Sequence, residues 1–281
     1  MSIVIDKRII PLTSLPRSGS TLLMSILNQN TSFTAFPDSD LPVLLVSIKA
    51  WSSEKIKNSQ LPHKVFQESI INFCRSGAEA WLNNNCPTNF SIDKNRAWIH
   101  QHQFMFQVFP NIKMILNIRD LRFVINSMLK AQSNTFNINF QNYYQNLNED
   151  FMIQRIKDCL NVKCLKQSLV ALKELIDIGP SYREQILIFR NEELILNPQN
   201  SMNRIYDFFE LPRYEHDFNH IEKVEPHYDN MYMPYGNHQI RSKLETKLPE
   251  TLTHVPKRYA DWIVEEYKWF YEFFYPEVLR Q

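Results

Sequence analysis

Short apolar segments that alternate with stretches of helical spacing recur along the chain. They lie at residues 8–15, 89–93, 113–118 and 185–189, and helical patterns cover 21–27, about 98–109, the stretch after 120, and 150–178. Strands that alternate with helices predict a parallel sheet covered on both faces, whose ligands bind at the carboxyl ends of the strands. We therefore expect an α/β fold. No repeat or low-complexity linker divides the chain, which favours one domain over residues 1–281.

The composition excludes several classes of protein. Lys and Arg number 31 against 30 Asp and Glu, so no net field attracts nucleic acid or acidic membrane. The four Cys form no C-x-x-C pair, which favours reduced thiols over a disulfide framework or a zinc site. No apolar run approaches the roughly 20 residues of a membrane span, and the N-terminus has no leader pattern. We expect a cytoplasmic protein without a metal, a membrane span or a nucleic-acid partner.

The sharpest motif comes after the first apolar segment and opens the first helix, with the sequence Leu15-Pro16-Arg17-Ser18-Gly19-Ser20-Thr21. Backbone amides at a helix start converge on one spot and bind anions. The hydroxyls of Ser18, Ser20 and Thr21 add donors, and Arg17 adds a cation. The pattern predicts a phosphate site, although it lacks the second Gly and the Lys of a Walker A loop. The alternative is an ordinary capped turn, because Ser and Thr favour helix starts anyway.

A second pair of residues stands at the end of the third apolar segment. Arg119 closes that segment, and Ser127 lies eight residues later, about two turns into the next predicted helix. Together they predict a second anion site at the edge of the same crevice. The alternative pairs Arg119 with Asp120 and leaves Ser127 in solvent.

Two further segments carry cations. The run Asp93-Lys94-Asn95-Arg96-Ala97-Trp98 comes after the second apolar segment, and Lys94 and Arg96 there are suited to neutralise charge on a leaving group. Its alternative is a solvated loop in which Asn95 caps the next helix. A basic stretch at residues 238–243 contains Arg241 and Lys243. Its alternative is an ordinary surface patch.

These segments together resemble the sulfotransferases that depend on 3′-phosphoadenosine 5′-phosphosulfate (PAPS). The P-[KR]-[ST]-G-[ST]-[ST] loop of that family matches residues 16–21, and its strand-end Arg with a Ser eight residues later matches Arg119 and Ser127. The Arg in the loop, at position 17, resembles the bacterial and tyrosylprotein sulfotransferases, which have Arg at this position. The D-x-N-R-x-W segment of the bacterial group matches residues 93–98. The resemblance covers about residues 8–245 and implies a P-loop-like sulfotransferase fold.

The resemblance also implies binding roles for individual residues. The 5′-phosphosulfate of PAPS would lie on the loop, and the 3′-phosphate would lie on Arg119 and Ser127 with help from the late basic segment. The residues implied to bind PAPS are Arg17, Ser18, Gly19, Ser20, Thr21, Arg119, Ser127, Arg241 and Lys243. The chain departs from the family at Asn191, which stands in place of the Tyr of an R-Y-E-x-L segment.

Catalytic roles are implied by the same resemblance. Arg17 and Lys94 would stabilise charge in the transition state, since Lys94 matches a Lys of the tyrosylprotein enzymes. Those enzymes have a Glu base before an I-P-[RK] segment. The matching stretch here is Phe36-Pro37-Asp38-Ser39-Asp40-Leu41-Pro42, and its spacing does not choose between Asp38 and Asp40. Either carboxylate could instead cap the next helix. His100 and His102 are further candidates for the base.

The expected reaction is in-line transfer of a sulfuryl group from PAPS to a hydroxyl or amine, without a metal. The sequence leaves open a small-molecule, lipid, glycan or peptide acceptor. One alternative is an ATP-dependent, kinase-like phosphotransferase with Asp93 or Asp120 as a metal ligand. Another is a nucleotide-binding module without catalysis. The aromatic run at residues 261–274 predicts a helix buried against the domain, or a homodimer surface as the less favoured interpretation, and neither assigns it chemistry.

Overall fold

A five-stranded parallel sheet forms the centre of the computed structural model, which describes residues 8–136, 149–178, 183–224, 240–248 and 251–280. The strand order is β2-β3-β1-β4-β5. The strands are β1 (Ile9–Ser14), β2 (Phe33–Phe36), β3 (Phe90–Lys94), β4 (Met114–Ile118) and β5 (Ile186–Arg190). Because β1 lies between β3 and β4, the carboxyl ends of these three strands are neighbours.

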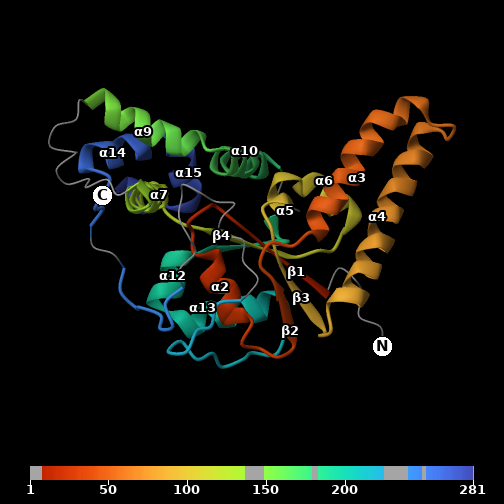
Figure 1. Cartoon of the computed structure of the whole chain (residues 1–281), viewed down its shortest axis with the longest axis horizontal. Coiled ribbons are helices and arrows are strands. Elements are labelled where there is room, and N and C mark those ends of the chain that lie inside the picture. The colour runs from red at the N-terminus through yellow and green to blue at the C-terminus, as the bar shows by residue number, and fades with distance from the viewer. Residues whose placement is uncertain (1–7, 137–148, 179–182, 225–239, 249–250, 281) are drawn as a thin grey trace.

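Helices cover both faces of the sheet (Figure 1). One face carries α2 (Ser20–Leu27), α12 (Asn191–Leu196) and α13 (Pro198–Phe208). The other carries α5 (Ala97–His100), α6 (His102–Val108), α7 (Leu121–Phe136), α9 (Glu149–Asn161), α10 (Lys163–Asp177), α14 (Lys257–Glu266) and α15 (Lys268–Phe274).

The apolar strands explain this two-sided cover. Successive strand residues point to opposite faces, so Ile9 packs in one core while Ile10 packs in the other. The same alternation sends Leu116 and Ile115 of β4 to opposite cores. A strand buried on both faces must be apolar throughout, and the apolar segments of the sequence indicate such strands.

A helical hairpin projects from one end of the sheet (Figure 1). It consists of α3 (Leu41–Lys55), a 3-10 turn η1 (Ile56–Asn58) and α4 (His63–Asn85). Another 3-10 turn, η3 (Val278–Arg280), comes after α15. None of the helices within the described ranges is long and apolar enough to cross a membrane.

The structure confirms the α/β fold with its parallel sheet and corrects several details. The helix expected at about 98–109 is two short helices that meet at Gln101, and the one expected at 150–178 divides at Val162. Strand β2 has no counterpart among the strands expected from the sequence. Pro11 lies in a central strand because pairing of β1 with β4 begins only at Leu12, so its missing amide falls outside that ladder.

Candidate functional site

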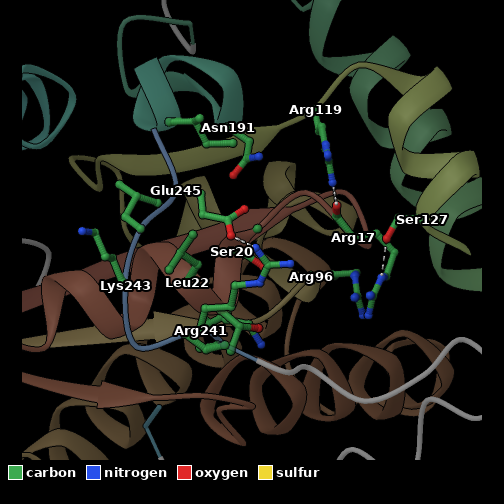
Figure 2. A pocket seen from close by; sticks show the side chains of 16 residues that line it. Arg17, Ser20, Leu22, Arg96, Arg119, Ser127, Asn191, Arg241, Lys243 and Glu245 are labelled. Carbon is green, nitrogen blue, oxygen red and sulfur yellow. Dashed lines mark hydrogen bonds and ion pairs between the residues drawn. The ribbon is translucent and has the colours of Figure 1, made fainter. Parts of the chain in front are cut away.

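A cavity of about 310 Å³ opens where β3, β4 and α12 meet the loop at residues 15–19, which we call the phosphate loop after its predicted ligand (Figure 2). Most of its polar lining is cationic, and the cations come from segments far apart in the sequence. The polar and glycine lining residues are Arg17, Gly19, Ser20, Thr21, Lys94, Arg96, Ser127, Arg119, Asn191, Arg241, Lys243 and Glu245. The structure therefore gathers almost all residues predicted to bind a nucleotide into one site.

Hydrogen bonds from the Ser18 side chain fix the loop that precedes α2. This side chain is fully buried, and its hydroxyl donates to the carbonyl oxygens of Leu15 at 2.7 Å and Asn117 at 3.2 Å. Its hydroxyl therefore anchors the loop to β4 and does not line the cavity. The backbone of Arg17 has a φ of 60° and that of Gly19 a φ of 84°, so the loop bends sharply on either side of Ser18.

Gly19 is required by both its backbone and its surroundings. Its left-handed backbone conformation favours glycine, and a Cβ at this position would overlap the side-chain oxygen of Asn191. Asn191 is 4% exposed, and its Oδ1 accepts no hydrogen bond from the described residues. The residue that replaces the family Tyr thus packs directly under the phosphate loop.

The second predicted anion site lies beside the first. The Nη1 of Arg119 donates to the carbonyl oxygen of Arg17 at 3.3 Å, and the Nε of Arg17 donates to Ser127 Oγ at 3.1 Å (Figure 2). Asp120 is bound by Arg122, with Nη2 2.6 Å from Oδ2. The alternatives that pair Arg119 with Asp120 and leave Ser127 in solvent are therefore wrong.

Lys94 approaches the cavity from the end of β3. Its Nζ donates to the carbonyl oxygen of Pro37 at 2.6 Å and lies 3.5 Å from Asp38 Oδ1. Asp40 is exposed at the start of α3 and makes no side-chain cap there. Of the two base candidates, Asp38 is therefore the one that contacts the predicted catalytic Lys.

The rest of this segment is structural as well as cationic. Asn95 Oδ1 accepts from the amide of Ala97 at 2.8 Å, as the alternative interpretation expected, while Arg96 lines the cavity. Asp93 is completely buried, and its carboxylate accepts from Trp98 Nε1 at 2.6 Å and Ser39 Oγ at 2.5 Å. Burial raises the pKa of the Asp93 carboxyl to about 6.

The late basic segment forms the rim of the cavity. Arg241 and Lys243 are exposed and line it, and Arg241 forms an ion pair with Glu245 (Figure 2). Residues 238 and 239, which belong to the same predicted patch, lie outside the described residues.

The two histidines considered as bases, His100 and His102, have partners of their own. His100 shares a hydrogen bond with Ser168 Oγ at 3.0 Å, and burial, together with nearby Arg96, lowers its pKa to about 4. His102 is buried, and its Nδ1 lies 2.9 Å from the carbonyl oxygen of Ile99. Neither ring lines the cavity.

Sequence reasoning missed a layer of side chains behind the cavity. Glu192 stands next to Asn191 at the start of α12, and it accepts hydrogen bonds from the Asp120 amide and from Tyr275. Tyr271 donates to Asp120. The sequence offered two local signals, the R-Y-E-x-L match that contains Glu192 and the aromatic run at residues 261–274. It assigned chemistry to neither, although Tyr271 in that run donates to Asp120.

Comparison with known proteins gives a family match. A family model described as the sulfotransferase family matches residues 10–216. Protein-tyrosine sulfotransferase 2 of Gallus gallus is 22% identical over 212 residues, which is 74% of this chain and 53% of that protein. Protein-tyrosine sulfotransferase 1 of Danio rerio is 20% identical over 258 residues, 87% of this chain and 67% of that protein. The chain thus spans only about half the length of the Gallus gallus relative.

A solved structure shares the fold. The sulfotransferase domain from the curacin biosynthetic pathway superimposes with a TM-score of 0.52 at 17% identity, covering 92% of this chain and 96% of that domain.

Proposed function

Because the chain belongs to the sulfotransferase family, we propose that it transfers the sulfuryl group of PAPS to a hydroxyl or amine of an acceptor. The observation that carries this proposal is the meeting of two predicted anion sites in one cavity, with Arg119 bonded to the loop and Arg17 bonded to Ser127. A nucleotide with phosphates on both its 3′ and 5′ positions suits that arrangement, whereas a nucleotide phosphorylated only at 5′ leaves one anion site without a partner.

The hydrogen-bond donors and cations of the cavity fit PAPS. The 5′ end would lie on the loop amides and the hydroxyls of Ser20 and Thr21 at the start of α2, where a helix dipole favours an anion. The 3′-phosphate would lie on Arg119 and Ser127, and Arg241 and Lys243 would close the site from the rim. When bound, PAPS supplies an activated sulfuryl group.

The chain's own groups then perform the transfer. The acceptor oxygen or nitrogen forms a bond to sulfur as the bond from sulfur to the 5′-phosphate oxygen breaks, and the electron pair passes to that oxygen. Arg17 and Lys94 stabilise the charge that develops there. Asp38, next to Lys94, accepts the acceptor's proton. We assign the base to Asp38 over Asp40 on this contact.

Peptide tyrosine is the acceptor class to test first, because two relatives are named protein-tyrosine sulfotransferases. Small alcohols and glycans come next in the same screen. The ATP-dependent alternative is less well supported, since both of its metal-ligand candidates have other partners. Asp93 accepts from Trp98 and Ser39, and Asp120 is bound by Arg122 and Tyr271.

The test is calorimetric binding of adenosine 3′,5′-diphosphate compared with adenosine 5′-diphosphate. We expect tighter binding of the 3′,5′ isomer, and we expect Arg119→Ala to weaken it by about 10- to 100-fold, since one charge-assisted contact contributes about 1.5–3 kcal/mol. Arg213→Ala is the matched control, because this Arg is exposed and pairs with Asp207 instead. Equal affinity for the two isomers would contradict the PAPS assignment. Turnover with PAPS and a tyrosine peptide then separates an enzyme from a module without catalysis.

A further inference from the structure

Two buried tyrosines stand behind the nucleotide cavity. Tyr271 lies in α15 and Tyr275 comes directly after that helix, and their exposed fractions are 0% and 4%. The hydroxyl of Tyr271 donates to Asp120 Oδ1 at 2.9 Å, and that of Tyr275 donates to Glu192 Oε2 at 2.9 Å. Each hydroxyl thus satisfies a carboxylate that is largely out of water.

Asp120 links Tyr271 to the predicted 3′-phosphate site. It is the residue directly after Arg119, and its Oδ1 accepts from the Arg122 amide at 2.9 Å, which caps the start of α7. The same helix carries Ser127 further along. The position of the Asp120 carboxylate therefore fixes both the end of β4 and the first turn of α7, the two elements that present the phosphate-binding side chains.

Glu192 links Tyr275 to both anion sites. Its Oε1 accepts from the Asp120 amide at 3.2 Å, so the starts of α7 and α12 are joined. Its neighbour Asn191 packs under Gly19 of the phosphate loop. The Glu192 carboxylate therefore connects the start of α12, which contacts the phosphate loop, to the end of β4, which carries Arg119.

The two carboxylates also affect the charge state of Arg119. The Arg119 guanidinium is largely desolvated, which lowers its pKa, while nearby Glu192 and Asp120 favour the charged form. Among the described residues, no carboxylate lies within ion-pair distance of Arg119, whose one hydrogen bond goes to the Arg17 carbonyl oxygen. The network supports the cation electrostatically and leaves its remaining donors for a ligand.

We propose that Tyr271 and Tyr275 are positioning residues that hold Asp120 and Glu192, and through them Arg119, in the arrangement that binds the 3′-phosphate of the donor. The proposal rests on the proposed function, because it presumes a 3′-phosphorylated nucleotide in this cavity. It assigns the aromatic C-terminal segment a role in selecting the donor that the sequence did not indicate.

The aromatic rings themselves are held independently of the hydroxyls. The Arg190 guanidinium lies 4.6 Å from the centre of the Tyr275 ring and pairs with Glu277 at 2.7 Å. The ring of Phe270 stacks on that of Tyr275, with the two ring centres 5.8 Å apart. Replacement of Tyr by Phe should therefore remove one hydrogen bond and keep the packing.

The experiment measures the affinities of the full chain and its Tyr271→Phe and Tyr275→Phe variants for adenosine 3′,5′-diphosphate and adenosine 5′-diphosphate. We expect each variant to bind the 3′,5′ isomer about 3- to 10-fold more weakly, the effect of one hydrogen bond. Affinity for the 5′-diphosphate should fall by no more than about 2-fold, because that ligand makes no contact with the Arg119 site and Glu192 reaches the loop only through its neighbour Asn191.

Tyr206→Phe is the matched control. Tyr206 is also fully buried, but its hydroxyl contacts Asn30 and His216 in the opposite core, so both affinities should be unchanged. In an Arg119→Ala background, Tyr275→Phe should weaken binding of the 3′,5′ isomer by less than about 2-fold, because the two changes act on one contact.

Two results would overturn the positioning role. One is an equal loss of affinity for both nucleotides, and the other is a full additional loss from Tyr275→Phe in the Arg119→Ala background. If the proposed function is wrong, the result differs, because the wild-type chain itself would then bind the two nucleotides with equal affinity. If the Tyr variants do not fold, Glu192→Gln tests the same link, with the same selective loss expected and an unselective loss overturning it.

Discussion

The nucleotide side of the molecule and the projecting α3–α4 hairpin are built in opposite ways. Around the cavity, polar side chains from the loop before α2, from α7 and its N-cap, and from α12 and α15 are buried or half-buried and make hydrogen bonds to one another and to the backbone. The hairpin instead exposes large apolar side chains to solvent, namely Val43, Leu44, Trp51, Leu61, Val65 and Phe73. Binding of a phosphate needs fixed donors at fixed places. An exposed apolar helix face imposes no such requirement on residue type.

The difference predicts where single substitutions act. On the nucleotide side the backbone and the side chains constrain one another, as where Gly19 meets Asn191. In the hairpin many positions have open space around them, as at Gly77, where a Cβ would meet nothing within 4 Å. Similar changes in the two regions should therefore differ in size and even in sign.

The largest expected effect on the nucleotide side comes from Gly19→Ala. The left-handed backbone conformation and the overlap with Asn191 should lower the free energy of unfolding by about 2–4 kcal/mol and weaken nucleotide binding. Urea denaturation measures the first effect and calorimetry the second. Gly77→Ala in α4 is the control, and it should stabilise the protein by up to about 1 kcal/mol. Equal destabilisation by both changes would break the comparison.

A smaller, pH-dependent effect is expected at Asp93, which accepts from Ser39 just before the hairpin begins. Its pKa in the folded protein is raised to about 6, so the folded state binds the proton more tightly than the unfolded state. The stability that this group contributes is present at low pH and is lost as the pH rises through about 6.

Between about pH 5 and pH 7.5 this loss amounts to about 1 kcal/mol. Asp93→Asn should remove it and flatten the pH dependence of the urea midpoint. Glu54→Gln, at an exposed carboxylate of the hairpin, is the control and should leave the slope as it is. A slope that survives Asp93→Asn would show that other groups carry the pH dependence.

The smallest effect is expected on the hairpin surface. Leu44 is 51% exposed, and Leu44→Ala should change the free energy of unfolding and the affinity for adenosine 3′,5′-diphosphate by less than about 0.5 kcal/mol. Its neighbour Leu45 is 2% exposed, and Leu45→Ala should cost about 2–5 kcal/mol in the same denaturation experiment. A large loss from Leu44→Ala would mean that this face is covered in solution.

The main strands were predictable because strands buried on both faces leave continuous apolar segments in the sequence. Strand β2, at Phe33–Phe36, was not, because it is only four residues long and pairs at the sheet edge. The breaks at Gln101 and Val162 were missed because the apolar spacing continues across both. The spacing of apolar residues therefore predicts that a helix forms, but it does not predict where the helix is interrupted.

Within the site, residues such as Arg17, Arg119 and Ser127 could be predicted from the sequence, because cations and hydroxyls after a strand are typical of phosphate binding. The contacts between them could not, because Arg17 and Ser127 are 110 residues apart. The support from Tyr275 to Glu192 spans 83 residues and leaves no local pattern at all. Such links depend on how helices pack, which the composition of either segment does not determine.

The hydroxyl of Ser18, bonded to two carbonyl oxygens beneath the loop, has a thermodynamic consequence. The conformational entropy of the loop is lost when the chain folds, and a phosphate that arrives later meets donors already in place. Association with the donor should therefore carry little entropic penalty from the loop. A change that frees the Ser18 anchor would transfer that penalty from folding to binding.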